Sequence, residues 1–171
     1  MMRRYGMSDD FAALHALLTR CFAYMQGRID PPSSLNRLTV DGLREMAENR
    51  EVWVMEDQAR PIACMILTPR PDTLYLGKLA VDSNQRGKGL ARALVEHALH
   101  RAERLGLESV TLETRIELVE NHATFGALGF RRIAETAHPG YDRPTSITMT
   151  RSLGGTGRGA GRGDTKVTRR P

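Results

Sequence analysis

The sequence predicts an α/β domain in which a mixed, mostly antiparallel sheet is flanked by helices. Three observations favour this fold class. A chain of 171 residues with 40% hydrophobic and 26% charged side chains is suited to one packed core. Apolar residues recur at helical spacing in two long segments and alternate at strand spacing in several short ones. Two of the short segments are joined by a tight turn, which predicts an antiparallel hairpin.

The N-terminal half predicts two helices followed by that hairpin. The side chains of Ser8 to Asp10 can cap a helix whose apolar stripe begins at Phe11. Pro31 and Pro32 interrupt the chain, and Thr39 starts a second helix. The expected elements are a helix over 11–22, a loop over 27–34, a helix over 39–49, and strands over 51–55 and 61–67.

The C-terminal half predicts a central strand, a long helix and further strands. Residues 74–81 are apolar on both alternating faces except at Lys78, which indicates a strand that is covered on both sides. The segment from Gly89 to Gly106 has a broad apolar face and stops at a glycine, as amphipathic helices often do. Further elements are expected as a strand over 109–114, a short helix over 121–128, and closing strands over 130–136 and 146–151.

The charge of the chain is concentrated at its C-terminal end. The net charge is +5, and residues 152–171 carry +4 of it together with six of the 16 glycines. This segment has almost no large apolar residue, so it cannot offset the entropy of ordering itself. We expect a domain over residues 1–151 and a flexible, basic, Gly/Arg-rich tail over 152–171. Because the body is nearly neutral, nucleic acid binding is expected at most weakly and through the tail.

Composition also bears on compartment and metals. No apolar run approaches the ~18 residues that a membrane span needs, so we expect no membrane contact. Cys21 and Cys64 lie far apart in apolar surroundings, which predicts reduced thiols in a cytoplasmic protein. His97 and His100 lie three residues apart on a helix, but no third ligand converges with them. We therefore expect an exposed histidine pair and no metal site.

The most informative segment is the turn between the central strand and the long helix. Glycines at a strand-to-helix turn let backbone N–H groups converge, and the helix start adds partial positive charge. Such a turn suits a phosphate or pyrophosphate. A Walker loop is excluded because it needs glycine at Asp82 and Ser or Thr at Gly89. A dinucleotide fingerprint is excluded because its third glycine position is Arg92.

At this turn the sequence resembles the GNAT (Gcn5-related) N-acetyltransferases. Residues 86–91, Arg-Gly-Lys-Gly-Leu-Ala, match the R/Q-x-x-G-x-G/A signature of that family. A strand ending at Val81 precedes the signature, and a strand and a short helix ending at Gly129-Phe130 follow it. The resemblance covers most of residues 7–151 in the order of elements. It implies the GNAT, or acyl-CoA N-acyltransferase, fold.

The resemblance also implies a reaction: direct attack of a primary amine on acetyl-CoA, which is the cosubstrate. In such enzymes the signature backbone holds the pyrophosphate, and the end of the preceding strand bonds the pantetheine arm. That strand also offers an N–H to the thioester carbonyl, which stabilises the oxyanion. The cofactor-binding residues expected on this basis are Leu79, Ala80, Val81, Arg86, Gly87, Lys88, Gly89, Leu90, Ala91, Asn121 and Phe125.

The chain departs from the family pattern in the distal short helix. Family members often have a tyrosine near the CoA sulfur as general acid, and that position here is Phe125, which cannot donate a proton. The position of the family's usual asparagine is Leu118. Asn121 lies one turn later, where it either takes over this role or caps the helix.

Two residues are candidate catalytic groups. Glu113 is expected to be a general base, since an acceptor ammonium must lose a proton before it attacks. The alternative is a structural carboxylate paired with Arg115. Residues 138–144 place a histidine, a tyrosine and charges between turn formers, so this loop could line the acceptor pocket. Tyr141 would then replace the missing acid; the alternative is a strand connection with an aromatic anchor.

Other functions stay open at this point. Phe125 leaves room for a CoA-binding module with little turnover, and another acyl-CoA could be the donor. A third class is a nucleic-acid-associated protein that works through its tail. The acceptor is expected to be a small-molecule or peptide amine that the sequence does not identify. A homodimer is also left open.

Overall fold

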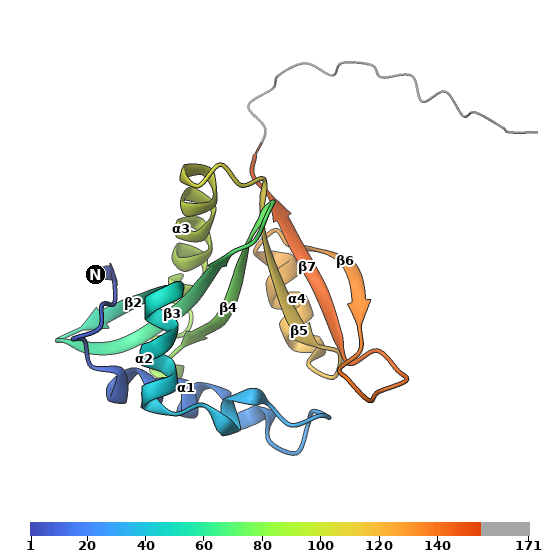
Figure 1. Cartoon of the computed structure of the whole chain (residues 1–171), viewed down its shortest axis with the longest axis horizontal. Helices are drawn as coiled ribbons and strands as arrows, with labels where there is room; N and C mark the ends of the chain where they lie inside the picture. The colour runs from blue at the N-terminus through green and yellow to red at the C-terminus, as the bar shows by residue number, and fades with distance from the viewer. Residues whose placement is uncertain (155–171) are drawn as a thin grey trace, which may run out of the picture.

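The computed structural model describes residues 1–154, as a seven-stranded sheet with four α-helices (Figure 1). The strand order is β1-β2-β3-β4-β5-β7-β6, and the β4–β5 pair alone is parallel among these neighbours. The strands are β1 (Met2–Arg4), β2 (Glu51–Asp57), β3 (Arg60–Pro69), β4 (Thr73–Val81), β5 (Ser109–Arg115), β6 (Arg131–Thr136) and β7 (Ser146–Ser152). The α-helices are α1 (Phe11–Phe22), α2 (Val40–Asn49), α3 (Leu90–Arg104) and α4 (Val119–Ala127). The predicted mixed, mostly antiparallel sheet flanked by helices is confirmed.

The first two helices begin where their capping side chains predict. The Asp10 carboxylate accepts from the N–H of Ala13 at 2.9 Å, and the Thr39 hydroxyl accepts from the N–H of Gly42 at 3.0 Å. The predicted hairpin is β2 and β3, and its two-residue turn holds Gln58 and Ala59 at positive φ.

Several element bounds differ from the sequence prediction by one or two residues, and one strand was not predicted. α4 begins at Val119, two residues before the expected start at 121. β1 was not predicted, because three residues containing two arginines carry no strand pattern. It forms by antiparallel pairing with β2, and Arg3 anchors it through ion pairs to Glu56 at 2.9 Å and Asp9 at 2.8 Å.

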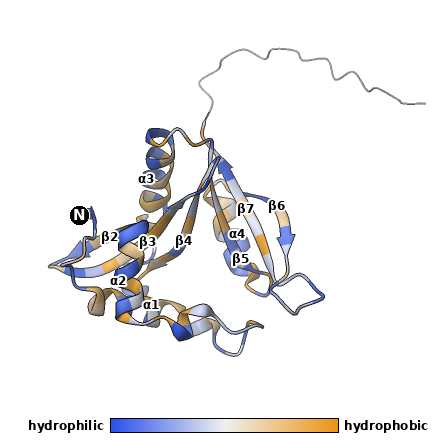
Figure 2. Ribbon diagram, viewed as in Figure 1, coloured by the Kyte–Doolittle hydropathy of each residue, from blue (hydrophilic) through white to orange (hydrophobic). Residues whose placement is uncertain are grey.

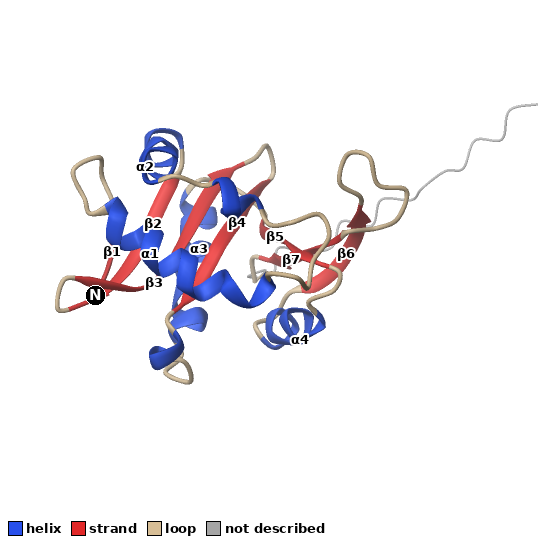
Figure 3. Ribbon diagram, turned by 90° about the horizontal axis from the view of Figure 1, so that it is seen from below, coloured by secondary structure: helices blue, strands red, loops and turns tan. Residues whose placement is uncertain are grey.

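Helices cover both faces of the sheet. α1 and α2 lie on one face and α3 lies on the other (Figure 3). Alternation along β3 supplies both cores: Met65 packs with the α3 side, whereas its neighbours Cys64 and Ile66 pack with the α1 side. Figure 2 shows hydrophobic and hydrophilic residues side by side on α3, as expected of a helix with one buried face.

A β-bulge in β4 changes which side chains face which helix. One extra residue of β4 lies opposite β3, and Lys78 within it has a φ of 50°. Leu76 packs toward α3 before the bulge, and Leu79 packs there after it, although three positions separate them. Lys78 and Ala80 are therefore turned toward the α1 face, where Ala80 joins the second core.

β4 and β5 diverge after a short parallel ladder. Their pairing covers Thr73 to Tyr75 against Ser109 to Thr111 and then stops. Beyond Tyr75 the edge of β4 that faces β5 has no strand beside it, and the sheet opens into a V (Figure 1). This opening sets the place of the cavity described below.

The described chain continues past the expected domain boundary at residue 151. β7 extends to Ser152, and the N–H of Leu153 donates to the carbonyl oxygen of Glu108 at 3.1 Å. The Leu153 side chain packs against the core on the α3 side. The rest of the predicted tail, residues 155–171, lies outside the described residues. Within residues 1–154 no helix is long and apolar enough to cross a membrane.

Candidate active site

A cavity of about 800 Å³ lies where β4 and β5 diverge. This volume is in the range of ligand pockets. Its lining comes from segments that are far apart in the sequence: the end of α1, β4, the turn before α3, β5 and α4. Of the expected cofactor-binding residues, it brings together Leu79, Ala80, Val81, Arg86, Ala91, Asn121 and Phe125.

One wall of the cavity ends at the glycine turn before α3. Gly87 and Gly89 have φ values of 78° and 75°, which L side chains rarely adopt. Gly89 is the N-cap of α3 and brings no capping side chain. The N–H groups from Gly87 to Arg92 have no acceptor among the described residues, and the first helical bond runs from Ala93 to Gly89. The turn is therefore a cluster of free donors at a helix start, next to Arg86 and Ala91 in the cavity wall.

The second wall is the open edge of β4. Leu79, Ala80 and Val81 line the cavity, beyond the point where β5 stops pairing with this strand. Because the edge has no neighbouring strand, its backbone groups are available to an extended ligand, which would take the place of a strand.

The third wall is α4. Phe125 lines the cavity and packs edge-on against Phe130, with ring centroids 6.2 Å apart. Asn121 is not the helix cap, which is Leu118. Its amide donates instead to the hydroxyl oxygen of Tyr24 at 3.0 Å.

Tyr24 is a cavity residue that sequence reasoning missed. It lies in a 3₁₀ turn (η1, Ala23–Met25) directly after α1, and it lines the cavity together with Asn121 and Phe125. Since Asn121 donates to it, the Tyr24 hydroxyl keeps its own proton free to donate. Arg28 lies 5.8 Å from the ring centre and pairs with Glu120 of α4 at 2.6 Å. No local pattern marks Tyr24, because its partners lie on α4.

A group of polar side chains lines the cavity on the α1 face. Glu113 and Arg115 project from β5, and Tyr75 and Lys78 come from β4. Burial raises the pKa of the Tyr75 hydroxyl and lowers the pKa of the Lys78 ammonium. The alternative pairing of Glu113 with Arg115 is not formed among the described residues, and the Arg115 Nη2 donates to the carbonyl oxygen of Pro32 at 3.3 Å. The cavity thus has titratable groups on one side and free backbone donors on the other.

The predicted loop over 138–144 contributes its histidine to this cavity, but not its tyrosine. His138 lines the cavity and bonds to Thr145, and burial followed by the charge of Arg115 lowers its pKa. Tyr141 is absent from the lining, and its hydroxyl donates to Asp30 at 2.7 Å. This hydrogen bond raises the pKa of Tyr141 and commits its proton to a carboxylate. The expected acid role of Tyr141 therefore has no support in the geometry.

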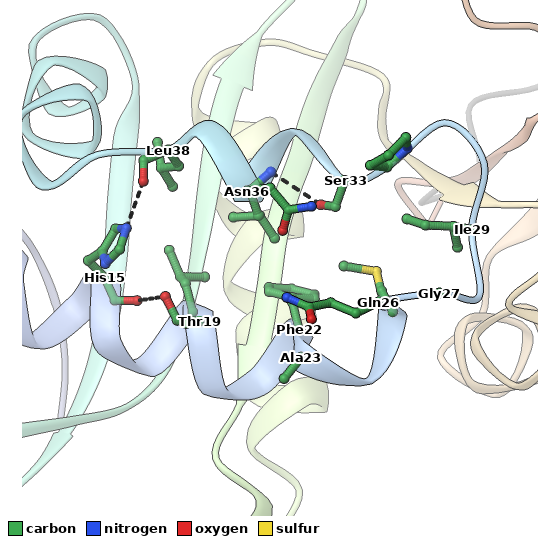
Figure 4. Close-up of a pocket in the computed structure, with 14 residues that line it drawn as sticks. His15, Thr19, Phe22, Ala23, Gln26, Gly27, Ile29, Ser33, Asn36 and Leu38 are labelled. Atoms are coloured by element: carbon green, nitrogen blue, oxygen red, sulfur yellow. Dashed lines mark hydrogen bonds between the residues drawn. The ribbon is translucent and has the colours of Figure 1, made fainter.

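A second cavity, of about 630 Å³, adjoins the first (Figure 4). Phe22, Met25 and Leu35 line both cavities. Its polar side chains include His15, whose Nε2 bonds to the carbonyl oxygen of Leu38 at 2.7 Å, and Thr19 (Figure 4). The second cavity therefore lies beside the first, between α1 and the segment over 33–38.

The described part of the chain gathers no group of three or more His, Cys, Asp or Glu side chains that could hold a metal ion. The two helical histidines differ from the expected exposed pair. His100 is exposed, but His97 packs edge-on against Trp53 with ring centroids 4.1 Å apart. Burial lowers the pKa of His97, and its buried Nε2 has no hydrogen-bond partner among residues 1–154.

Comparison with known proteins places the chain among acetyltransferases in sequence. A family model described as "Acetyltransferase (GNAT) family" matches residues 11–130. The N-acetylaspartate synthetase of Danio rerio is 34% identical over 86 residues, which are 49% of this chain and 30% of that protein. The L-2,4-diaminobutyric acid acetyltransferase of Bordetella parapertussis is 29% identical over 140 residues, 79% of this chain and 70% of that protein. The chain thus spans less than a third of the first relative's length.

Solved structures share the fold. An aminoglycoside 6'-acetyltransferase type Ii superposes with a TM-score of 0.73 at 16% identity, over 92% of this chain and 99% of that one. A GNAT family acetyltransferase from Elizabethkingia anophelis, solved with acetyl-CoA bound, superposes with a TM-score of 0.64 at 14% identity, over 90% and 97%. At these identities the likeness concerns the arrangement of the elements.

Proposed function

Because the chain belongs to the GNAT acetyltransferase family, we propose that it moves an acetyl group from acetyl-CoA directly onto the primary amine of an acceptor. The predicted family and fold are confirmed by the family match and by the structural neighbours. One observation carries the proposal for this chain. A cluster of free N–H donors and an unpaired strand edge border one cavity, beside a group of titratable side chains.

The donor-binding side suits an extended molecule that ends in phosphates. The free N–H groups from Gly87 to Arg92 offer a site for the pyrophosphate, and the Arg86 side chain adds a positive charge. The edge of β4 at Leu79 to Val81 offers hydrogen bonds to the amide-containing pantetheine arm. An N–H of the same edge would polarise the thioester carbonyl and stabilise the oxyanion that forms on attack.

The acceptor side supplies the base in this proposal. Glu113 lines the cavity and forms no ion pair with Arg115, so its carboxylate is available to take the proton of an acceptor ammonium, directly or through water. Glu113→Gln is expected to lower kcat while the affinity for acetyl-CoA stays unchanged.

The proposed general acid differs from Tyr141, the residue expected from the sequence. The amine nitrogen bonds to the acetyl carbon, the carbon–sulfur bond breaks, and the CoA thiolate must take up a proton. Phe125 cannot give it, and Tyr141 is engaged with Asp30. Tyr24 lines the same cavity as Phe125, and its proton is free. We assign the acid role to Tyr24.

The similar proteins do not identify the acceptor of this chain. The names of the similar proteins refer to different amines, among them aspartate, diaminobutyric acid and aminoglycosides. A second candidate function is CoA binding with little turnover, which Phe125 favours because the usual proton donor is missing at that position. A further candidate is transfer of a different acyl group, and measuring turnover with other acyl-CoAs tests it.

The experiment that tests the donor site is acetyl-CoA binding by Gly89→Asp, measured by calorimetry and by melting temperature. Aspartate at this position adds a negative charge beside the free N–H groups. Gly106→Asp is the matched control, because Gly106 has a φ of 71° and open space around its Cβ position, but lies after α3. Acetyl-CoA at a hundred times its Kd should stabilise wild type and Gly106→Asp by about 2.7 kcal/mol. Wild-type affinity in a folded Gly89→Asp protein would contradict the site.

A further inference from the structure

The Arg115 guanidinium, on the side of the cavity that carries Glu113, forms no ion pair with a carboxylate among residues 1–154. Arg115 lies at the end of β5 and lines the cavity. Its Nη2 donates to the carbonyl oxygen of Pro32 at 3.3 Å, but its buried Nη1 meets no acceptor among residues 1–154. The acidic groups that influence it form no ion pair with it: Asp30 bonds to Tyr141 and Arg143, and Glu117 lies 3.8 Å from Arg143, although its buried Oε2 has no partner among residues 1–154.

The Nη1 atom is sealed from solvent, so a ligand in the cavity meets the other parts of the Arg115 side chain, which line it. The planar, always charged guanidinium matches the two oxygens of a carboxylate better than any other side chain does. Arg115 lines the cavity and forms no ion pair among residues 1–154, so it suits an anionic group on the molecule that enters the acceptor side.

The position of Glu113 sets the expected distance between this anionic group and the amine that reacts. Glu113 and Arg115 are two residues apart on β5, so their side chains leave the same face of the strand. A strand rises about 3.3 Å per residue, which places the two side chains about 7 Å apart along the strand. A negative and a positive group at this spacing complement a molecule whose ammonium and carboxylate are a few bonds apart.

We propose that the acceptor is a free amino acid whose carboxylate is bound by Arg115 while its amine faces Glu113. The inference rests on the proposed acetyl transfer and names the acceptor class for the same site. Polyamines and aminoglycosides carry no carboxylate for Arg115 to bind. A peptide N-terminus lacks the neighbouring carboxylate and leaves Arg115 unpaired. Arg115 is thus a specificity-determining residue.

The test compares amines that differ only in the carboxylate. Each amino acid is assayed beside its amide and its decarboxylated amine, with spermidine and an aminoglycoside in the same panel, and kcat and KM are measured from CoA release. Wild type and Arg115→Gln are compared with Arg60→Gln, a control at an exposed arginine that lines neither cavity. The melting temperature and the KM for acetyl-CoA are recorded for each variant.

We expect wild type to prefer at least one amino acid over its amide and its amine by about 100-fold or more in kcat/KM. In Arg115→Gln this ratio should fall at least about tenfold, through the KM of the amino acid, with the KM for acetyl-CoA unchanged. Arg60→Gln should keep the wild-type ratio.

Two outcomes overturn the inference while acetyl transfer stands. One is a wild type that acetylates amides, simple amines or polycations as well as it acetylates amino acids, a result that does not depend on any variant. The other is an unchanged ratio in a folded Arg115→Gln protein. If acetyl-CoA binds but no amine in the panel is acetylated, the proposed function itself fails and this inference fails with it.

Discussion

At the residue scale, the site depends on a phenylalanine at one position and a tyrosine at another. Phe125 and Tyr24 line the same cavity, and Asn121, which lies on α4 with Phe125, donates to the Tyr24 hydroxyl at 3.0 Å. In the proposed mechanism, the 3₁₀ turn after α1 supplies the proton donor that α4 lacks. A thiolate is a tolerable leaving group, since a thiol has a pKa of about 8.5. Loss of the acid should therefore slow the transfer without abolishing it.

Tyr24→Phe is expected to lower kcat by about 10- to 100-fold, the lower part of the range for general acid catalysis. Steady-state CoA release measures it. Adding Phe125→Tyr to this variant should restore part of the rate, because it returns a hydroxyl to the same cavity. Tyr141→Phe, whose hydroxyl bonds to Asp30, should remain near wild type. A Tyr24→Phe enzyme with wild-type kcat would show that Tyr24 is not the acid. A Tyr141→Phe enzyme with a lowered kcat would return the acid role to Tyr141.

At the element scale, an ion pair fastens β2 to α3 beneath the sheet. Glu51 is 6% exposed, and its carboxylate accepts hydrogen bonds from Arg101 Nε and from Trp53 Nε1, both at 2.9 Å. Burial alone would raise the pKa of Glu51, but the bonds from Arg101 and Trp53 outweigh it and hold the pKa below its ordinary value. The charged pair therefore ties stability to pH.

Glu51→Gln is expected to destabilise the fold by about 1–3 kcal/mol at neutral pH, as measured by denaturant unfolding. A carboxyl with a lowered pKa in the folded state stabilises the protein above its unfolded pKa, and this contribution is lost as the pH falls through the folded pKa. The difference between wild type and Glu51→Gln should accordingly shrink below about pH 4.3. A difference that is constant down to pH 3 would show that the carboxylate charge is not what stabilises the pair.

The sequence predicts an element when the residues that determine it lie within that element or next to it. The starts of α1 and α2 follow from Asp10 and Thr39, whose side chains cap the helices they precede. The donor turn follows from Gly87 and Gly89, because their positive φ is a property of glycine. β1 has no such local cause, since it exists through its pairing with β2. The same holds for the bulge at Lys78, which no residue pattern in β4 marks.

At the scale of the whole molecule, the site is assembled from segments that meet only in the folded chain. Tyr24 and Asn121 are 97 residues apart in sequence, and Arg115 meets Pro32 across 83. The proposed donor half of the site rests on one short signature, so the sequence alone was enough to propose it. The acceptor half could not, since its contacts join the end of α1, the 28–33 segment, β5 and the 138–145 loop. Sequence reasoning consequently placed the acid on Tyr141, in the one polar loop that it could recognise.

The C-terminal boundary provides a test of how much chain the fold needs. Truncation after Gly154 keeps every contact of the described residues, so the melting temperature should not change. Truncation after Arg151 removes the packing of Leu153 and its hydrogen bond to Glu108, and should lower the melting temperature by about 3–6 °C. Calorimetry measures both. Equal losses in the two truncated proteins would show that residues 155–171 contribute to stability, against the expectation of a tail.

In the proposed function, acetyl groups pass from acetyl-CoA to an amine in the cavity between β4 and β5. Amine-dependent CoA release tests this transfer in wild type, Gly89→Asp and Gly106→Asp, with the acetylated product identified by mass spectrometry. We expect one N-acetylated amine per CoA released by wild type and Gly106→Asp, and neither product from Gly89→Asp. A wild-type protein that binds acetyl-CoA but yields no acetylated amine across amino acids, polyamines, aminoglycosides and peptides would contradict it.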